Sequence, residues 1–290
     1  MIGWSMVMAV ILLVANRYWK GKEVRSADWK APEEKRLTAE QHEFIREHAA
    51  ACQDVIANVL SHVTPEQLNP YVFNSRGTFP DMMRYYRMNP GTQMMEVPIR
   101  SVGITVLELP EGPAIEGRWV TEDGRFIDAV FREENGEWRL DWHHFARFSE
   151  HPWPLFLAGD GPEQAEFRLL VRRRLVRSIL DMEGRPLSLV FHAPRFARPD
   201  DPGPPSPVFE LDFESKPARI LMAGFNQARN GQRPFQSLLP RVEPDEDMMR
   251  VRVVMRRIEG EEERRFEIVD VLACHWLQHE DLGVSLGETQ

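Results

Sequence analysis

The sequence contains few of the residues on which small disulfide-linked scaffolds and zinc-binding folds depend. Its 290 residues include two cysteines, Cys52 and Cys274, too few for a disulfide framework or a cysteine-based zinc site. A single bridge between them is one arrangement, and two buried free thiols are the favoured interpretation. Cysteine usage therefore does not decide between an oxidising and a reducing compartment.

An excess of positive charge is also missing. The chain has 36 lysine and arginine residues against 45 aspartate and glutamate residues, a net charge of −9. This balance argues against general nucleic-acid binding, because neutralising phosphates requires a basic face. The chain also has no phosphate-binding P-loop, no Gly-x-Ser-x-Gly elbow and no Gly-x-Gly-x-x-Gly fingerprint. The sequence therefore predicts no cofactor and no nucleic-acid partner.

Long apolar runs are absent except near the start of the chain. Residues 2–15 carry no charge and are followed by an aromatic and basic stretch, residues 16–22. A membrane-spanning helix needs roughly 20 apolar residues. The run reaches that length only if Tyr18 and Trp19 lie among the lipid headgroups. A cleaved signal peptide is the alternative, but the basic residues follow the run and no small-x-small cleavage site is evident.

We therefore predict an uncleaved single-pass anchor over residues 1–19 that contacts a bacterial inner membrane through residues 2–19. Taken literally, the positive-inside rule places the chain from Arg17 onward in the cytoplasm. A basic stretch ahead of the apolar run would reverse that orientation. The side of the membrane on which the remaining residues lie thus stays open, as does the oligomeric state.

The rest of the chain has the composition of a globular protein, with 42% apolar and 28% charged residues. Its length suffices for two domains that each bury a core. We predict a fold of the α+β class, in which a cone-like domain of helices and antiparallel sheet precedes a second, mainly antiparallel α+β domain. After the anchor, the predicted parts are a juxtamembrane spacer at residues 20–37, the first domain at 38–150, a linker at 151–165, the second domain at 166–280 and a tail at 281–290.

The first domain opens with helices. Thr38 and Gln41 match a capping box, and apolar residues follow at helical spacing as far as residue 63. Shorter helices are predicted to start at Thr64 and at Thr78. An alternating strand at residues 97–109 comes next.

A β-meander is predicted over residues 117–148. Two turn signals, Glu-Asp-Gly at 122–124 and Glu-Asn-Gly at 134–136, separate runs rich in aromatic and β-branched residues. In a continuous strand, Trp138, Leu140, Trp142 and His144 share one face.

This order of elements resembles the nuclear transport factor 2-like superfamily, which includes ketosteroid isomerase and the polyketide cyclases. The resemblance covers about residues 38–150 and depends on the element order and on the hairpin Asp-Gly-…-Asn-Gly-Glu-Trp-Arg-Leu of residues 123–140. It implies a cone whose sheet wraps around the helices and leaves a pocket at its open end. Members serve as enzymes, binders or bare scaffolds, so the fold alone does not define a function.

The second domain resembles no family that we recognise. Residues 167–180 fit either a helix or a strand, and the turn at 181–184 followed by an apolar run favours a hairpin. A short strand at 208–213 and a helix capped by Ser215 follow. A further hairpin is predicted from residues 249–258 and 265–276.

The candidate catalytic residues come from the end of the meander and from the third helix. On the tryptophan face, His144 would lie at the rim of the pocket, where an imidazole can act as acid or base. Asp128, Asp81 and Tyr85 are the candidate partners. The simpler interpretation makes His144 a structural histidine at a strand end, and we favour it.

Trp138, Leu140 and Trp142 are candidates to line the ligand pocket, although core packing is the simpler interpretation of these residues and the one we favour. No metal site is predicted. His275 and His279 have the spacing of a helical zinc pair, but they follow a strand.

The favoured function is that of a non-enzymatic accessory or binding protein held at a membrane, with a protein partner or an apolar ligand. The alternative is a small-molecule lyase, isomerase or hydrolase of the cone type that uses a rim histidine and an aspartate as acid and base. A purely structural component of a membrane complex is a third hypothesis, and it predicts an apolar patch on the outer face of the first sheet.

The anchor hypothesis predicts that deletion of residues 1–19 moves the chain from the membrane fraction to the soluble fraction in a folded state. Fractionation followed by circular dichroism measures both properties. Aggregation of the shortened chain would show that residues 1–19 pack against the remainder instead.

Overall fold

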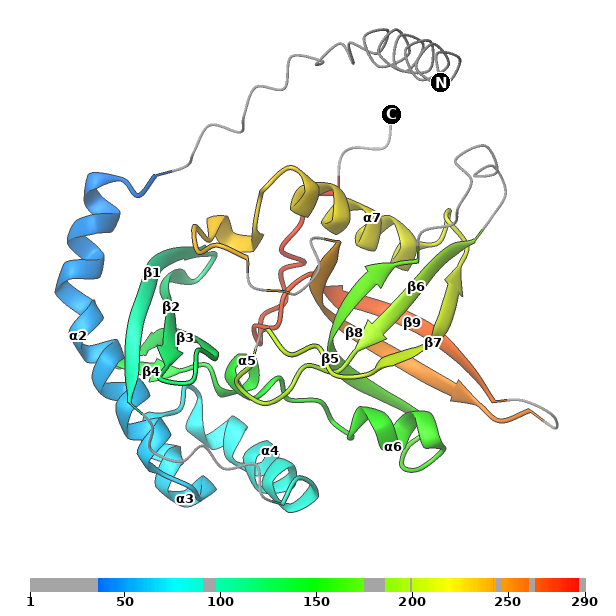
Figure 1. Cartoon of the computed structure of the whole chain (residues 1–290), viewed down its shortest axis with the longest axis horizontal. Helices are drawn as coiled ribbons and strands as arrows, with labels where there is room; N and C mark the ends of the chain where they lie inside the picture. Colours follow the sequence, from blue (N-terminus) through cyan, green and yellow to red (C-terminus); the bar gives the residue numbers. More distant parts are fainter. Residues whose placement is uncertain are drawn as a thin grey trace, which may run out of the picture. The chain divides into compact units, whose positions relative to one another are not determined.

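The computed structural model describes residues 36–90, 98–174, 186–198, 200–241, 243, 247–260 and 264–286. Residues from Arg36 onward form a unit of helices and two antiparallel sheets (Figure 1), which confirms the α+β class. The predicted anchor at residues 1–19 lies outside the described residues. Among the helices that are described, none has both the length and the hydropathy to cross a membrane.

The helical layer begins as the sequence predicts. The helix α2 (Ala39–Ser61) starts at the predicted capping box, in which Thr38 Oγ1 accepts from the Gln41 backbone N–H. The short α3 (Pro65–Leu68) and the 3₁₀ turn η1 (Asn69–Tyr71) follow. The last helix of this layer, α4 (Ser75–Met88), begins three residues before its predicted start at Thr78.

The first sheet is a meander with the order β1-β2-β3-β4. Its strands are β1 (Ile99–Leu109), β2 (Gly112–Thr121), β3 (Phe126–Glu134) and β4 (Glu137–Leu140). Both predicted turns are present. Asn135 and Gly136 have φ of 56° and 81°, the left-handed conformation that a tight hairpin turn requires.

Alternation gives this sheet two chemically different faces. One face packs on α2 through buried apolar side chains that include Ile115, Trp119 and Phe131. The opposite face carries buried charged side chains, among them Arg118 and Asp128. Buried apolar side chains lie on the same face beside them. The second face positions the site described below.

The prediction of a continuous strand through residue 148 is wrong beyond Leu140. Asp141 caps a short helix, α5 (Trp142–Ala146), because its side chain accepts a hydrogen bond from the backbone N–H of His144 at 3.0 Å. Arg147 ends the helix in a left-handed conformation with φ 52°. Trp142 and His144 therefore do not continue the strand face of Trp138.

The second sheet has the order β7-β6-β5-β8-β9. The predicted hairpins are confirmed, since β5 pairs with β6 and β8 pairs with β9 in antiparallel register. The turn at residues 181–184 lies outside the described residues. The elements of this half are α6 (Trp153–Ala158), β5 (Gln164–Arg173), β6 (Leu187–His192), β7 (Pro205–Leu211), α7 (Lys216–Arg229), the 3₁₀ turn η3 (Pro234–Gln236), β8 (Met248–Ile258) and β9 (Arg265–Ala273).

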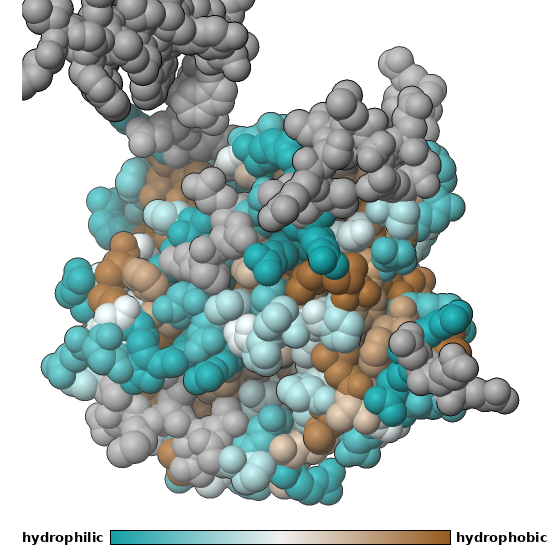
Figure 2. Space-filling view, turned by 45° about the vertical axis from the view of Figure 1, so that its right-hand side comes forward, coloured by the Kyte–Doolittle hydropathy of each residue, from teal (hydrophilic) through white to brown (hydrophobic). Residues whose placement is uncertain are grey.

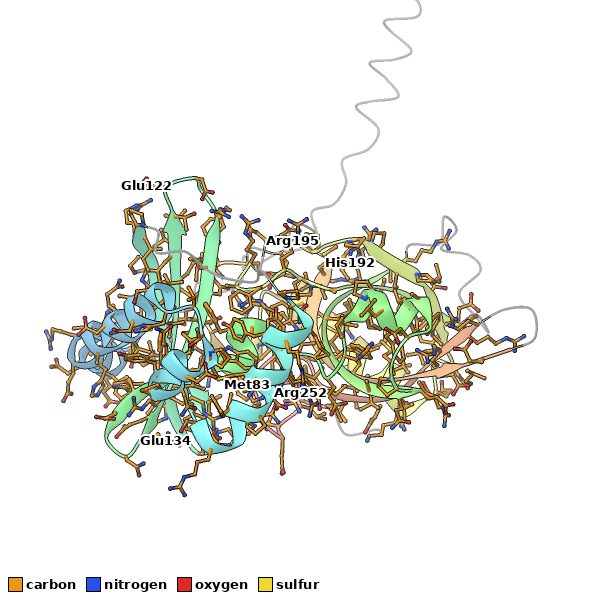
Figure 3. All side chains as sticks on the ribbon, turned by 90° about the horizontal axis from the view of Figure 1, so that it is seen from below. Met83, Glu122, Glu134, His192, Arg195 and Arg252 are labelled. Atoms are coloured by element: carbon orange, nitrogen blue, oxygen red, sulfur yellow. The ribbon has the colours of Figure 1, made fainter. Side chains whose placement is uncertain are left out.

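This sheet curls around α6, which lies within the stretch predicted as a linker (Figure 3). Trp153 and Phe156 of α6 pack against Phe167 of β5, with ring centroids 4.9 and 4.8 Å away. The edge strands β7 and β9 approach each other, and Phe209 lies 5.8 Å from Phe266. The aromatic side chains of α6 thus fill the interior of the curled sheet.

We expect Phe167→Ala to lower the free energy of unfolding by about 3–5 kcal/mol, because it leaves a cavity between the strands and α6. Val269→Ala on the exposed part of β9 is the matched control and should change stability little. Equilibrium unfolding in urea measures the free energy of unfolding of both variants. Equal effects of the two substitutions would show that α6 does not form the centre of this core.

Candidate functional site

A buried pair of opposite charges lies on the outer face of the first sheet. Arg118 of β2 and Asp128 of β3 are cross-strand neighbours. Arg118 Nε donates to Asp128 Oδ1 at 2.6 Å, and its Nη2 donates to Oδ2 at 2.8 Å. This two-point contact fixes the carboxylate, which is fully buried.

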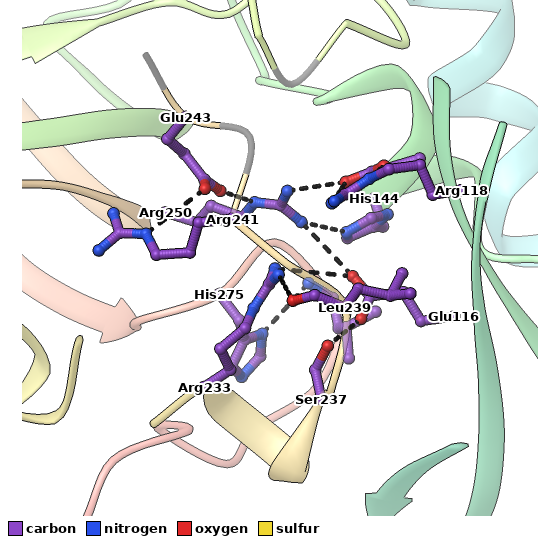
Figure 4. Close-up of polar contacts among 12 residues, drawn as sticks. Glu116, Arg118, His144, Arg233, Ser237, Leu239, Arg241, Glu243, Arg250 and His275 are labelled. Atoms are coloured by element: carbon purple, nitrogen blue, oxygen red, sulfur yellow. Dashed lines mark hydrogen bonds and ion pairs between the residues drawn. The ribbon is translucent and has the colours of Figure 1, made fainter. Parts of the chain in front are cut away.

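Arg250 reaches this pair from β8 in the second sheet (Figure 4). Its Nη2 donates to Asp128 at 2.9 Å and its Nε donates to Glu243 at 2.8 Å. Its Nη1 lies 3.4 Å from His144 Nε2 and 3.8 Å from Glu116. The guanidinium group also faces the ring of Trp276 at 4.8 Å. One arginine from the second sheet therefore contacts four polar partners.

We call this group the Arg250 cluster. Its members are Glu116, Arg118, Asp128, His144, Glu243 and Arg250, all of them buried.

Electrostatic contacts keep Asp128 and Glu243 ionised. Burial by itself would raise the pKa of Asp128, but the hydrogen bonds from Arg118 and the charges of Arg250 and Arg118 hold that pKa below its ordinary range. For Glu243, the charges of Arg250 and Arg233 likewise outweigh burial and lower the pKa to about 2. Burial would lower the pKa of Arg250, and its three carboxylate neighbours raise it instead.

His144 is neutral in this environment. Burial first, and then the charges of Arg250 and Arg147, hold its pKa well below the ordinary value of 6.5. Because Arg250 can only donate, His144 Nε2 is the acceptor, and the ring proton lies on Nδ1. The buried Nδ1 has no hydrogen-bond partner. His144 therefore offers a hydrogen-bond donor and carries no charge at neutral pH.

A cavity of about 80 Å³ adjoins the cluster. Its polar lining includes Glu116, His144, Arg233, Ser237, Arg241, Glu243, Arg250 and His275, and its apolar lining includes Leu107, Val130, Gly224, Met249, Cys274 and Leu277. The walls come from both sheets, from α7 and from the segment around η3. The cavity is thus formed by residues that are far apart in the sequence.

The predicted catalytic residues separate into two places. His144 and Asp128 both contact Arg250, which lies between them. Asp81 instead accepts from His143 Nε2 at 3.0 Å, and Tyr85 packs edge-on against Trp142 at 5.5 Å. The predicted partners Asp81 and Tyr85 therefore do not join His144.

The predicted pocket residues lie in the core beside α2. Trp138, Leu140 and Trp142 are each less than 7% exposed. Trp138 packs edge-on against Phe44 of α2 at 5.9 Å. Trp142 borders a cavity of only about 10 Å³, roughly the room for one water molecule. These side chains fill the space between helices and sheet where the resemblance implies a pocket.

Sequence reasoning missed Arg250, Glu243 and Glu116. Arg118 and Asp128 could have been paired from the hairpin turn between them, because equal offsets from that turn place them opposite each other. Arg250 comes from more than 100 residues later along the chain, and no local pattern distinguishes it from the other arginines of β8.

The described residues include no group of three histidine, cysteine, aspartate or glutamate side chains placed to hold a metal ion. His275 and His279 have separate partners: His275 Nε2 bonds to the carbonyl oxygen of Asp281, and His279 bonds to Glu111. No protein-family model, curated protein or solved structure matches the chain. Its role is therefore inferred from this geometry.

We expect Asp128→Asn to lower the free energy of unfolding by about 3–5 kcal/mol, because Arg118 and Arg250 stay buried without their shared carboxylate. Asp123→Asn is the control. Asp123 pairs with Arg125 at the exposed β2–β3 turn and should matter little. Urea unfolding at pH 7 measures both. If the two variants were equally stable, the buried pair would not be a determinant of the fold.

Neutral His144 also predicts a pH dependence. The unfolded chain binds a proton at this histidine below about pH 6.5 and the folded chain does not, so the free energy of unfolding decreases as the pH falls. The slope is up to about 1.4 kcal/mol per pH unit. His144→Gln should flatten the decline between pH 6.5 and 5, and His42→Gln, at an exposed site of α2, should not. An unchanged slope in His144→Gln would contradict a neutral, buried imidazole.

Proposed function

We propose that this chain is a non-enzymatic binding protein whose ligand occupies the cavity beside the Arg250 cluster. The observation that carries the proposal is a cavity of about 80 Å³ whose lining combines charged and apolar side chains. Small-molecule sites combine a mainly apolar lining with a few fixed polar groups in this way. The ion pairs hold the charged side chains of the lining in place, so a ligand would meet groups that are already in position.

The arrangement of charges favours binding over acid–base catalysis. A general base needs a pKa near the working pH and access to the substrate. Asp128 accepts hydrogen bonds from both Arg118 and Arg250, which hold its pKa low. Among the described residues, no hydrogen bond joins the imidazole of His144 to a carboxylate. The cone-type acid–base mechanism of a lyase, isomerase or hydrolase therefore lacks support in this geometry.

A purely structural role has less support than ligand binding. That hypothesis expects an apolar patch on the outer face of the first sheet, but Arg250 of β8 and Ser237 beside η3 contact this face instead. On the face of the molecule that Figure 2 shows, apolar residues lie in separate groups among hydrophilic ones. Both observations favour a ligand in the cavity over a broad protein-docking surface.

Two further parts of the proposed function, the membrane anchor and the superfamily relationship, come from the sequence. Residues 2–19 hold the protein at a membrane, an inference supported by their apolar character and the basic residues that follow. Residues 38–150 are related to the nuclear transport factor 2-like cones, an inference supported by helices that precede an antiparallel meander.

A fragment library screened by ligand-observed NMR tests the binding proposal. We expect hits that bind the wild type and Ala223→Phe but lose binding to Ala228→Phe. Ala228 of α7 lines the cavity and Ala223 of the same helix does not, and both are partly exposed. If Ala228→Phe bound every hit as the wild type does, the cavity would not be the ligand site.

A further inference from the structure

The charges around the cavity do not balance among the residues that the structure describes. The charged side chains that line the cavity are three arginines, Arg233, Arg241 and Arg250, and two glutamates, Glu116 and Glu243. The two histidines of this region, His144 and His275, are neutral because burial lowers their pKa values. The site therefore carries one more positive than negative charge, although the chain as a whole is acidic.

Arg233 places part of this excess at the cavity. It lines the cavity, and its side chain is 13% exposed. Its Nη1 donates to the carbonyl oxygens of Leu239 and Pro240, which hold the side chain in place without neutralising it. Its Nη2 lies 3.8 Å from Glu116 Oε1, beyond hydrogen-bond distance. Glu116 is also shared with Arg250 and Ser237, so its charge is divided among three partners.

Arg147 does not line the cavity and forms no salt bridge with a carboxylate among the described residues. It is buried, and its guanidinium group faces the ring of Trp276 at 5.2 Å. Its Nη1 donates to the carbonyl oxygens of Phe145 and His144, whereas Nε and Nη2 are buried with no partner. Burial, and then the charge of Arg250, lower its pKa to about 9. The carboxylates of Asp128 and Glu243 act on its charge, and Arg147 is not part of the excess at the cavity lining.

The cavity lining also includes apolar side chains. Val130, Met249 and Leu277 contribute aliphatic or thioether groups. Gly224 of α7 allows the helix to approach Met249 and Cys274 closely, since a Cβ there would lie 2.8 Å from the sulfur atoms of both residues. These apolar side chains suit a hydrocarbon or aromatic group.

Building on the proposed function, we infer that the ligand is a small monocarboxylate, whose anionic group binds Arg233 and whose apolar body lies against Met249 and Leu277. A single negative charge balances the single excess positive charge of the cavity lining. A carboxylate also matches the planar fork of an arginine. A phosphate shares this chemistry but brings closer to two negative charges beside Glu116 and Glu243, which disfavours it.

Titration of the full chain with benzoate, benzamide and inorganic phosphate, followed by NMR and calorimetry, tests the inference. Benzoate and benzamide have the same shape and differ in charge. We expect benzoate to bind at least about tenfold more tightly than benzamide, the usual minimum for a hydrogen bond to a charged group. We expect phosphate to bind more weakly than benzoate.

Variants locate the anion. Arg233→Gln should remove the preference for benzoate over benzamide, and Arg233→Lys should keep most of it because the positive charge remains. Arg229→Gln, at an exposed position in the last turn of α7 that does not line the cavity, is the control and should behave as the wild type. Thermal unfolding of each variant, followed by circular dichroism, shows whether it is folded.

Three outcomes would overturn the inference. If benzamide bound as tightly as benzoate and Ala228→Phe displaced both, the ligand class would be wrong while the binding proposal stood. If phosphate bound more tightly than benzoate and Arg233→Gln abolished that binding, the anion would be a phosphate. If none of the three probes bound, the carboxylate would be excluded, and the fragment screen would judge the binding proposal separately.

Discussion

The structure depends most on the contact between Arg250 of β8 and Asp128 of β3. It joins two sheets that share no strand pairing. Removing two such charges from water costs several kcal/mol per ion, and their attraction offsets this only when every partner is well placed. Here Arg118 fixes Asp128 from one side, and Glu243 fixes Arg250 from the other. Each charge is therefore stable in the interior only while the others are present.

This dependence explains where the cavity lies and why its lining contains both charged and apolar side chains. Charged residues on the outer face of the first sheet accept hydrogen bonds from Arg250 and from Ser237, which lies in the segment around η3. The helix α7 packs on the second sheet through apolar contacts, which include Leu221 and Phe225. The cavity lies between the polar contacts on the first sheet and the apolar contacts of α7 on the second sheet. Its polar groups are held by ion pairs before any ligand arrives, which lowers the ordering cost of binding.

Local chemistry predicted most of the fold, and long-range contacts determined the site. The capping box at Thr38 and the left-handed Asn-Gly turn at residue 135 are short-range signals, and both appear in the structure. The strand alternation failed at Asp141, because its side chain caps a helix that periodicity does not reveal. Arg250 could not be predicted, since its partners come from β2, β3, α5 and a loop that only the folded chain brings together.

The most direct test is a double-mutant cycle between Asp128 and Arg250, in which Asp128→Asn, Arg250→Met and the double variant are unfolded in urea. If the contact joins the sheets as described, the double variant loses less stability than the two single losses combined, with a coupling free energy of roughly 2 kcal/mol or more. Strictly additive losses would show that the two residues act independently. In that case the contact between Arg250 and Asp128 would not be what joins the two sheets.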